Sequence, residues 1–446
     1  MSAGQDIPDD HPAQCAACHA PGEHLSPVEP GLDTGGISLL ACDRCGSVTM
    51  WPQPDKDYTA HAGSETELRD YVEMNCSIHD ITKAVMPAVM ATGAKRYLDV
   101  GCGFGFSLDI VRRLAGCDVV GIEPAHYGRA GRDLLGVPVL PDVLSGPPGA
   151  RTPPELSRPF DVIFASEVIE HVSDPGAFLE TLSAYLAPDG MLALTTPRAA
   201  AVTEAHTRNE KLAVISPGAH VFLYSAAAFE AALRQAGFPH VVVIESGVTQ
   251  MAYAARVPFS FPEISPGALT TQYLQSALET DTPREPVSTV LQCRLYRSLI
   301  EQAQWEAASS LDRDIEIRMA PQDINFADYD AFLAKFRASE PSLSYLRGIL
   351  YLVHERRRVD AHHWFMSSFR LCCAKLQIAP SVCAVEADMV WRALFHAALS
   401  ARHSGDRELA ARTWRIAEER AGADFLPDIS EELRERADRE LKLSGG

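Results

Sequence analysis

The sequence predicts an α/β protein: a doubly wound, seven-stranded Rossmann-like sheet, a small N-terminal zinc ribbon and a C-terminal α-helical, tetratricopeptide-like domain. Three observations predict this fold. Two Cys-x-x-Cys pairs lie near the N-terminus, strands alternate with helices from residue 96 to residue 257, and helical periodicity dominates after about residue 261. We therefore expect domains at residues 1–60, 61–260 and 261–446.

The composition is that of a globular, acidic protein. The chain has 446 residues, 46% of them hydrophobic, and a net charge of −19, so a sizeable core is available. Nucleic-acid binding depends on Lys and Arg, so no nucleic acid is expected as a partner. No apolar run is long enough to span a membrane and the N-terminus lacks an apolar leader, so no membrane association and a cytoplasmic location are expected.

The first domain is predicted from its cysteines. Cys15 and Cys18 form one Cys-x-x-Cys pair, and Cys42 and Cys45 form a second. A two-residue spacer lets one turn present two sulfurs to one zinc ion, and four thiolates complete its tetrahedron. We expect a structural zinc that supplies folding free energy to a segment with few large apolar groups. Four free thiols or a redox dithiol are the alternatives.

The second domain begins with a glycine loop. One or two helices are expected over residues 65–92, and an apolar strand, Tyr97–Val100, then runs into Gly101-Cys-Gly-Phe-Gly105 and a helix. Glycine lets the backbone approach a ligand closely, and the start of the helix adds free N–H groups. The next strand ends at Glu123, where a carboxylate can accept hydrogen bonds from both hydroxyls of a ribose.

Alternating strands and helices continue to residue 257. Because this alternation is typical of parallel sheets, we expect a doubly wound sheet that is closed by one hairpin. The further strands are predicted at 137–140, 160–166, 191–196, 240–245 and 251–257, and the further helices at 127–135, 177–186 and 226–236.

Residues 93–257 resemble the class I S-adenosylmethionine-dependent methyltransferases. The resemblance rests on Leu98-Asp-Val-Gly-Cys-Gly-Phe-Gly105, on Gly121-Ile-Glu-Pro124 and on Phe160-Asp-Val-Ile-Phe-Ala-Ser-Glu-Val-Ile-Glu-His-Val172, in that order. Dehydrogenases usually carry Gly-x-Gly-x-x-Gly, so the spacing here favours the methyl donor over a dinucleotide. The resemblance implies an enzyme that uses S-adenosylmethionine as its cofactor.

The resemblance also implies a donor site along the loops that follow the strands. Glu123 is expected to hold the ribose hydroxyls, Asp142 to accept from the adenine amino group, and Glu167 to line the path to the sulfonium. The alternative is that these acids are solvated residues at strand ends. The expected donor-binding residues are Asp99, Gly101, Cys102, Gly103, Phe104, Glu123, Asp142, Val143 and Ser166.

An oxygen acceptor must lose a proton during methyl transfer, which requires a general base. The candidates are His171, Glu167, Glu170 and His220. We expect His220 to be the base, because the resemblance implies that its segment, 218–225, overhangs the acceptor pocket. His171 is the alternative base, or it has a structural role only.

A zinc-knuckle segment ahead of this fold is similar to the sugar methyltransferases of antibiotic and surface-glycan pathways. Their C-methylating members use a Glu-His pair and a nearby Tyr. Here Ala219 stands in place of the Glu before His220, and Tyr224 lies one residue away from the usual position of the Tyr. We therefore expect O-methylation of a sugar, glycan or related small molecule. An RNA methyltransferase and a non-catalytic scaffold are the alternatives; the acidic ribbon argues against the first, and the intact glycine loop against the second.

The third domain is predicted to be helical. Apolar stripes recur at 345–354, 361–376, 387–402 and 407–420. Ala410, Trp414 and Ala417 resemble one tetratricopeptide-type hairpin. This domain could bind a protein partner, mediate self-association, cover the acceptor site or simply pack as a helical appendage.

Overall fold

The structure is a computed structural model, and it describes residues 12–54, 65–75, 77–204, 208–280, 285–379 and 383–441. It divides into two compact units. Unit 1 comprises Met1–Gly63 and Ile78–Leu269, and unit 2 comprises Ser64–Ser77 and Thr270–Gly446. The three domain boundaries expected from the sequence stay a prediction.

Unit 1 is built on a seven-stranded sheet. Its strands are β4 (Arg96–Val100), β5 (Asp118–Ile122), β6 (Val139–Leu140), β7 (Phe160–Ser166), β8 (Leu186–Pro197), β10 (His240–Ser246) and β11 (Thr249–Ala255). They lie in the order β10-β11-β8-β7-β4-β5-β6. The strands from β8 to β6 run parallel, whereas β10 and β11 form an antiparallel hairpin beside β8. The predicted Rossmann-like sheet is confirmed.

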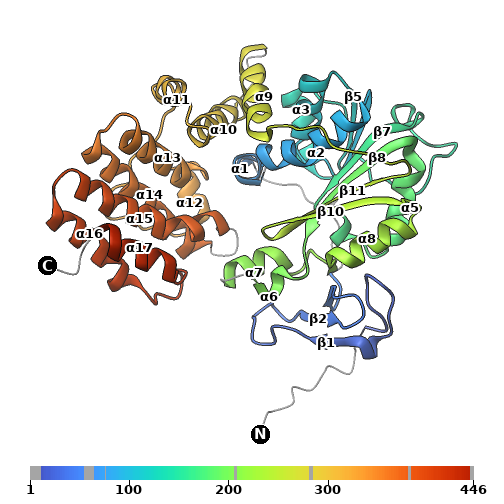
Figure 1. The fold of residues 1–446 in the computed structure, drawn as a ribbon, viewed down its shortest axis with the longest axis horizontal. Helices are drawn as coiled ribbons and strands as arrows, with labels where there is room; N and C mark the ends of the chain where they lie inside the picture. Colours follow the sequence, from blue (N-terminus) through green and yellow to red (C-terminus); the bar gives the residue numbers. More distant parts are fainter. Residues whose placement is uncertain are drawn as a thin grey trace, which may run out of the picture. The chain divides into compact units, whose positions relative to one another are not determined.

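Helices cover both faces of this sheet. Figure 1 shows α2 (Ile78–Thr92) and α3 (Phe106–Ala115) on one side, and α5 (Pro175–Tyr185) and α8 (Ala226–Gln235) on the other. The central strands are therefore near-continuous apolar runs, and Leu98 is fully buried. Unit 1 also contains α4 (His126–Leu135), α6 (Ala201–Glu204), α7 (Arg208–Ile215) and the short turns η1 (Gly22–His24), η3 (Pro154–Leu156) and η4 (Ile169–His171).

The strand predicted at residues 191–196 begins earlier than expected. The residues Ala187–Gly190 belong to β8, where the pairing with β7 shifts register between Phe160 and Val162. A Cβ at Gly190 would lie 2.9 Å from the Asp161 carbonyl oxygen. The Pro-Asp-Gly sequence therefore forms a bulge packed closely against β7 instead of a free turn before the strand.

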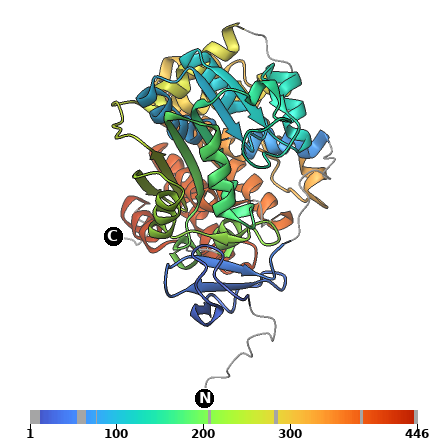
Figure 2. The ribbon, with the colours of Figure 1, turned by 90° about the vertical axis from the view of Figure 1, so that its right-hand side faces the viewer.

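A second, four-stranded antiparallel sheet contains the N-terminal segment. Its order is β1 (Leu25–Pro27), β2 (Ser38–Cys42), β3 (Val48–Trp51) and β9 (Phe222–Leu223). Figure 2 shows the three N-terminal strands in dark blue, beside the main sheet of the same unit. The fourth strand, β9, comes from the segment that directly follows His220. This pairing has no counterpart in the sequence-based prediction.

Unit 2 is helical, as predicted. Successive helices from α13 to α16 pack against one another, but the likeness of one hairpin to a tetratricopeptide repeat stays a prediction. The helical elements of this part are α1 (Glu65–Asp70), η2 (Tyr71–Asn75), α9 (Pro266–Thr280), α10 (Val287–Glu301), α11 (Trp305–Asp312), α12 (Tyr329–Leu333), α13 (Glu340–Val353), α14 (Arg358–Ile378), α15 (Ala384–His403), α16 (Arg407–Arg420) and α17 (Glu431–Leu441).

A buried ion pair joins two of these helices. Lys375 Nζ on α14 lies 2.8 Å from Glu386 Oε1 on α15 and 3.1 Å from the Ala338 carbonyl oxygen. Both charged side chains are almost fully buried. A buried charge that loses its partner is costly, so this contact restricts how α14 and α15 can pair.

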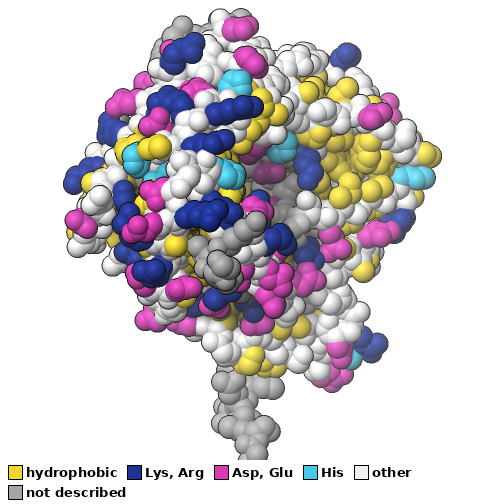
Figure 3. Space-filling model, turned by 60° about the vertical axis from the view of Figure 1, so that its left-hand side comes forward, with side chains coloured by type: hydrophobic (Ala, Val, Ile, Leu, Met, Phe, Trp, Pro, Cys, Tyr) yellow, Lys and Arg dark blue, Asp and Glu magenta, His cyan; other side chains and the backbone are white. Residues whose placement is uncertain are grey.

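Surface properties add two observations. Among the helices that the structure describes, none is long and apolar enough to cross a membrane. On the face in Figure 3, Lys and Arg side chains are interspersed with Asp and Glu side chains. The expectation that nucleic acid is not a partner stays a prediction.

Candidate active site

The glycine loop between β4 and α3 has a backbone that favours glycine. Gly101, Gly103 and Gly105 have φ values of 75°, 52° and 85°. A Cβ at Gly101 would lie 2.5 Å from Val168 Cγ2, and one at Gly105 would lie 2.9 Å from Val137 Cγ2. The loop therefore needs glycine both for its dihedral angles and for close packing.

The other two residues of this loop turn their side chains into the core. Cys102 is 9% exposed and Phe104 is 1% exposed. The loop can therefore offer a ligand only its backbone, together with the N–H groups at the start of α3, where Gly105 provides no side-chain cap. This geometry fits the donor-binding roles expected for Gly101–Phe104.

Glu123 connects the ends of β4 and β5. Its Oε2 accepts a hydrogen bond from the Gly103 N–H at 2.9 Å, and its Oε1 accepts one from the Ala125 N–H at 2.9 Å. Burial raises the pKa of this carboxyl, while the two N–H groups oppose the shift. Each oxygen keeps a further lone pair, so the carboxylate can still accept from ribose hydroxyls.

Asp99, at the end of β4, has an unused buried oxygen. Its Oδ2 accepts from the Ser107 hydroxyl, while its Oδ1 is buried with no hydrogen-bond partner among the described residues. Burial raises the pKa of Asp99 to about 7, and the Ser107 hydrogen bond opposes the shift. An unsatisfied buried acceptor is costly, so this oxygen fits a ligand that brings a donor, such as the amino group of S-adenosylmethionine.

Asp142 and Val143 follow β6 and are exposed. The Asp142 carboxylate accepts from the Val143 N–H at 2.7 Å, and Val143 is 54% exposed. Because β5 and β6 are parallel neighbours, both residues lie at the same edge of the sheet as Glu123. Their expected roles at the adenine ring stay predictions.

Ser166 and Glu167 are joined through a threonine at the end of β8. Thr195 Oγ1 lies 2.7 Å from Ser166 Oγ and 3.0 Å from Glu167 Oε1. The single Thr195 hydroxyl hydrogen goes to the carboxylate, so the Ser166 hydroxyl donates to Thr195. The sequence analysis missed Thr195, although its place at the carboxyl end of a central strand is a recognisable signal.

Two histidines converge on one buried carboxyl group. His171 Nδ1 lies 2.9 Å from the Ala219 carbonyl oxygen, and His220 Nδ1 lies 2.9 Å from the Val214 carbonyl oxygen. Because a carbonyl oxygen only accepts, each Nδ1 carries a hydrogen, and each Nε2 points away from that carbonyl. The Nε2 atoms lie 4.0 Å and 3.9 Å from Glu170 Oε1.

Glu170 is the least exposed member of this cluster. Its side chain is fully buried; Oε2 accepts from the Thr196 hydroxyl at 2.9 Å, whereas Oε1 has no hydrogen-bond partner in the described part of the chain. Burial, with repulsion from Glu167 second, holds its pKa well above the usual range. The shift favours the neutral form of Glu170, which would not draw a proton onto either imidazole. The three groups also have the donor atoms of a metal site.

The four predicted zinc ligands lie together. The Sγ atoms of Cys15 and Cys45 are 3.8 Å apart, as are those of Cys18 and Cys42, and all four lie within 4.8 Å of one another. A tetrahedron with Zn–S bonds of about 2.3 Å has S···S edges of about 3.8 Å. The sulfur positions therefore fit one zinc ion.

The ribbon sheet contacts the histidine cluster through the backbone of Val221. The Val221 carbonyl oxygen accepts from the Met50 N–H of β3 at 2.9 Å, and the Val221 N–H donates to the Glu170 carbonyl oxygen at 2.8 Å. Val221 directly follows His220. The position of His220 is thus connected to β3 of the N-terminal sheet on one side and to η4 on the other.

Comparisons with known proteins agree with this geometry. Residues 74–242 match the family model described as "Methyltransferase domain". The ubiquinone biosynthesis O-methyltransferase of Rhodopseudomonas palustris (strain BisA53) is 36% identical over 103 residues, covering 23% of this chain and 39% of that protein. The protein of the same name from Caulobacter sp. (strain K31) is 33% identical over 110 residues, covering 23% and 40%.

Solved structures of methyltransferases are also similar to part of the chain. A SAM-dependent methyltransferase from Aquifex aeolicus is 22% identical, covering 44% of this chain and 100% of that chain, with a TM-score of 0.32. The plantazolicin methyltransferase BpumL, in complex with a desmethylPZN analog and SAH, is 17% identical, covering 43% and 84%, with a TM-score of 0.32.

The match of residues 74–242 to a methyltransferase domain, together with the sheet order and the glycine loop, supports the prediction of a class I S-adenosylmethionine-dependent methyltransferase domain. The methyl donor S-adenosylmethionine is the cofactor of this class. The matches to ubiquinone biosynthesis O-methyltransferases span about two fifths of those proteins' own length.

A first prediction concerns the fit of Gly101 against Val168. We expect Gly101→Ala to lower the free energy of unfolding by more than the roughly 1–2 kcal/mol of left-handed strain alone, because its Cβ would also overlap Val168. Gly93→Ala is the matched control, since Gly93 has φ 59° and no atom within 4 Å of its added Cβ. Denaturant unfolding measures the free energy of unfolding of both variants and of the wild type.

Removal of the overlap should separate strain from steric clash. Adding Val168→Ala to Gly101→Ala is expected to restore the part of the free energy of unfolding by which Gly101→Ala falls below Gly93→Ala. Equal destabilisation by Gly93→Ala and Gly101→Ala would contradict the steric argument.

Proposed function

We propose that this protein transfers the methyl group of S-adenosylmethionine to a hydroxyl oxygen of a small molecule. The observation that carries the proposal is the pair of imidazole Nε2 atoms around Glu170, next to the donor loop. The turn that holds Glu170 and His171 also contains Val168, whose side chain packs against Gly101. The names of the related ubiquinone biosynthesis O-methyltransferases support an oxygen acceptor.

We assign the donor site to the residues expected from the sequence. Asp99 Oδ1 would accept from the donor's amino group, Glu123 from the ribose hydroxyls, and Asp142 from the adenine amino group. Ser166 and Glu167 would lie beside the sulfonium. The buried, unpartnered Asp99 oxygen is the strongest support, since a bound amino group would satisfy it.

The base in this proposal is His220, with His171 as the alternative. S-adenosylmethionine supplies a methyl group on a positively charged sulfur. His220 Nε2 would take the proton of the acceptor hydroxyl while the acceptor oxygen bonds the methyl carbon and the carbon–sulfur bond breaks. The Val214 carbonyl oxygen fixes the required tautomer by accepting from Nδ1.

A sugar, glycan or related metabolite is the acceptor class that we favour. The support is the resemblance of the ribbon-plus-methyltransferase arrangement to sugar methyltransferases. RNA is the second candidate, and the net charge of −19 argues against it. A screen of metabolite pools with isotope-labelled donor, followed by mass spectrometry of the labelled products, would identify the acceptor.

We also propose that Cys15, Cys18, Cys42 and Cys45 bind one structural zinc ion per chain. Cys18→Ser should remove zinc in metal analysis and unfold the ribbon strands. Because Val221 then loses its hydrogen bond from Met50, turnover should fall by about 10–100-fold, the usual effect of lost supporting residues. Affinity for the donor should stay within about twofold, since β4 and β5 carry that site independently of the metal.

A buried cysteine outside the ribbon is the matched control for this experiment. Cys117→Ser, in the same unit, should keep zinc and turnover. Zinc content that is unchanged in Cys18→Ser, or donor affinity lost together with zinc, would argue against the assignment.

Donor binding should depend on pH through Asp99. Its pKa of about 7 means that the free carboxyl is largely protonated below pH 7, whereas a cationic amino group prefers the carboxylate. Affinity should therefore rise from about pH 5 to pH 7 and fall again above about pH 8, where the amino group of the donor loses its proton. Calorimetry across this range measures the profile.

Two variants test the source of this pH dependence. Asp99→Asn should weaken binding and abolish the rise, whereas Ser107→Ala, which removes a hydrogen bond to the charged form, should move the rise to higher pH. A flat wild-type profile below pH 7 would rule out the contact between Asp99 and the amino group.

The base is tested by replacing the two histidines separately. His220→Ala should lower turnover by roughly 10²–10⁴ with donor affinity unchanged, and His220→Gln should not restore activity because an amide cannot take the proton. His171→Ala is the comparison. If His171→Ala causes the larger loss, the base is His171, and near wild-type turnover in both variants would exclude a histidine base.

A further inference from the structure

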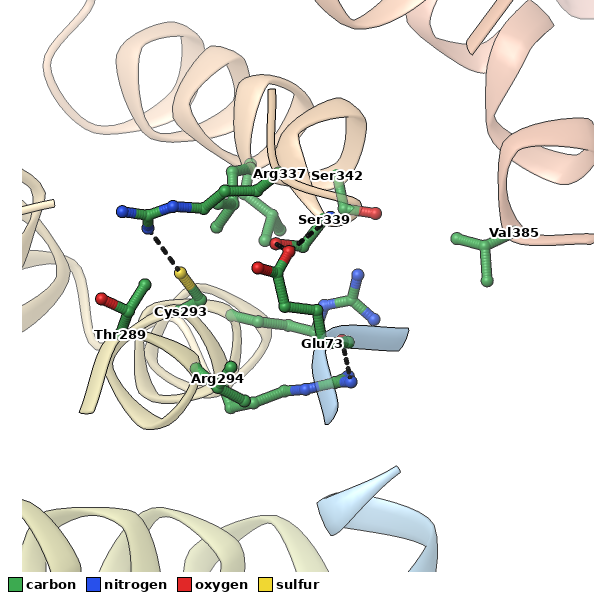
Figure 4. A pocket seen from close by; sticks show the side chains of 12 residues that line it. Glu73, Thr289, Cys293, Arg294, Arg337, Ser339, Ser342 and Val385 are labelled. Carbon is green, nitrogen blue, oxygen red and sulfur yellow. Dashed lines mark hydrogen bonds between the residues drawn. The ribbon is translucent and has the colours of Figure 1, made fainter. Parts of the chain in front are cut away.

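Unit 2 contains a small cavity that the proposed methyl transfer does not use. It is lined by residues of η2, α10 and the start of α13, together with Val385 of α15, and its volume is about 50 Å³ (Figure 4). A water needs roughly 10–15 Å³ by the same measure. The cavity therefore has room for a few waters or for one compact oxyanion.

The lining of this cavity is basic. Glu73 contributes the one carboxylate among the lining residues, and that group already accepts from Arg69 at 3.0 Å and from the Ser339 N–H and hydroxyl at 3.3 Å. A local excess of positive charge is notable in a chain of net charge −19. Three half-buried arginines line the cavity: Arg294, Arg297 and Arg337.

Two of these guanidinium groups have weak or no acceptors within the described residues. Arg337 Nη1 donates to Cys293 Sγ at 3.7 Å, a weak acceptor that Figure 4 shows beside it. Neither Arg297 nor Arg337 forms an ion pair with any carboxylate of the described chain within 4.0 Å. Their remaining N–H groups are therefore available to a ligand.

The start of α13 adds further donors. Ser339 precedes this 14-residue helix and makes no side-chain capping bond to it, and the buried Ser342 in its first turn also lines the cavity. The N-terminus of a helix carries partial positive charge. Here the Ser339 and Glu340 N–H groups already donate to Glu73 and to the Arg337 carbonyl oxygen, so Ser342 is the donor that this helix start adds. Arginines on α10 and before α13, a helix start and hydroxyl groups thus surround the same small space.

We propose that this cavity binds a phosphate group, either as inorganic phosphate or as the phosphoryl end of a small phosphomonoester. Guanidinium groups form paired hydrogen bonds with phosphate oxygens and keep their charge at all physiological pH values. The Ser342 hydroxyl at the start of α13 suits a remaining oxygen. The site lies outside residues 74–242, which match the methyltransferase family, and it shares no residue with the proposed donor site.

Calorimetry on the full-length protein tests the proposal, with inorganic phosphate and glycerol 3-phosphate as the two probes. Arg297→Gln should weaken phosphate binding at least about tenfold, because it removes a charged donor pair. Arg297→Lys should lie between the wild type and Arg297→Gln, since it keeps the charge and loses the planar fork. Arg412→Gln, on the exposed surface of α16, should bind like the wild type.

The two probes distinguish the sources of the phosphate. Binding of inorganic phosphate alone supports a site for the free ion, and binding of both supports a site for a phosphoryl group. Absence of binding to the wild type, or equal affinity in wild type and Arg297→Gln, overturns the proposal. The melting temperature of Arg297→Gln should be unchanged, which excludes misfolding as the cause of weaker phosphate binding. Its affinity for S-adenosylmethionine should also be unchanged, which separates failure of this proposal from failure of the proposed function. If Arg297→Gln is misfolded, Arg337→Gln replaces it.

Discussion

The candidate active site depends on the two backbone hydrogen bonds of Val221. One bond comes from Met50 in the ribbon strand β3, and the other goes to Glu170 in η4. They hold the residue beside His220 between β3 and η4. A short N-terminal segment that cannot build a large core thus supports a segment about 170 residues further along the chain. The proposed zinc on its four clustered cysteines would supply the folding free energy that this segment lacks.

The η4 turn and the residues just before it connect the proposed donor half of the site to the proposed acceptor half. Val168 packs against Gly101 of the donor loop, while Glu170 binds the Val221 backbone and faces both imidazoles. A displacement of this turn would therefore change donor and acceptor geometry together. Rigid coupling of this kind is what an in-line displacement requires, because its rate depends on the alignment of acceptor oxygen, methyl carbon and sulfur.

Local signals made much of this arrangement predictable. The glycine spacing, the acid at Glu123 and the two cysteine pairs each reflect contacts between residues close in sequence or at the ends of neighbouring parallel strands. The pairing of β3 with β9 was not predictable, because a two-residue strand has no periodicity. Nor could the sequence reveal that Glu170 lies between His171 and His220, since that depends on how a distant segment returns to the sheet.

Burial gives Glu170 a role that its sequence position does not suggest. A charged carboxylate 3.9–4.0 Å from two imidazoles would favour their protonated forms and so remove the base. Burial holds the pKa of Glu170 well above its usual range, which opposes the charged form of this carboxyl and so opposes protonation of the two imidazoles. In the proposed transfer, an imidazole that takes the proton of the acceptor becomes positively charged 3.9–4.0 Å from Glu170 Oε1, and this charge would lower the pKa of the carboxyl. Because Oε1 has no hydrogen-bond partner in the described part of the chain, its partial negative charge can stabilise the imidazolium as it forms, with no proton leaving the carboxyl.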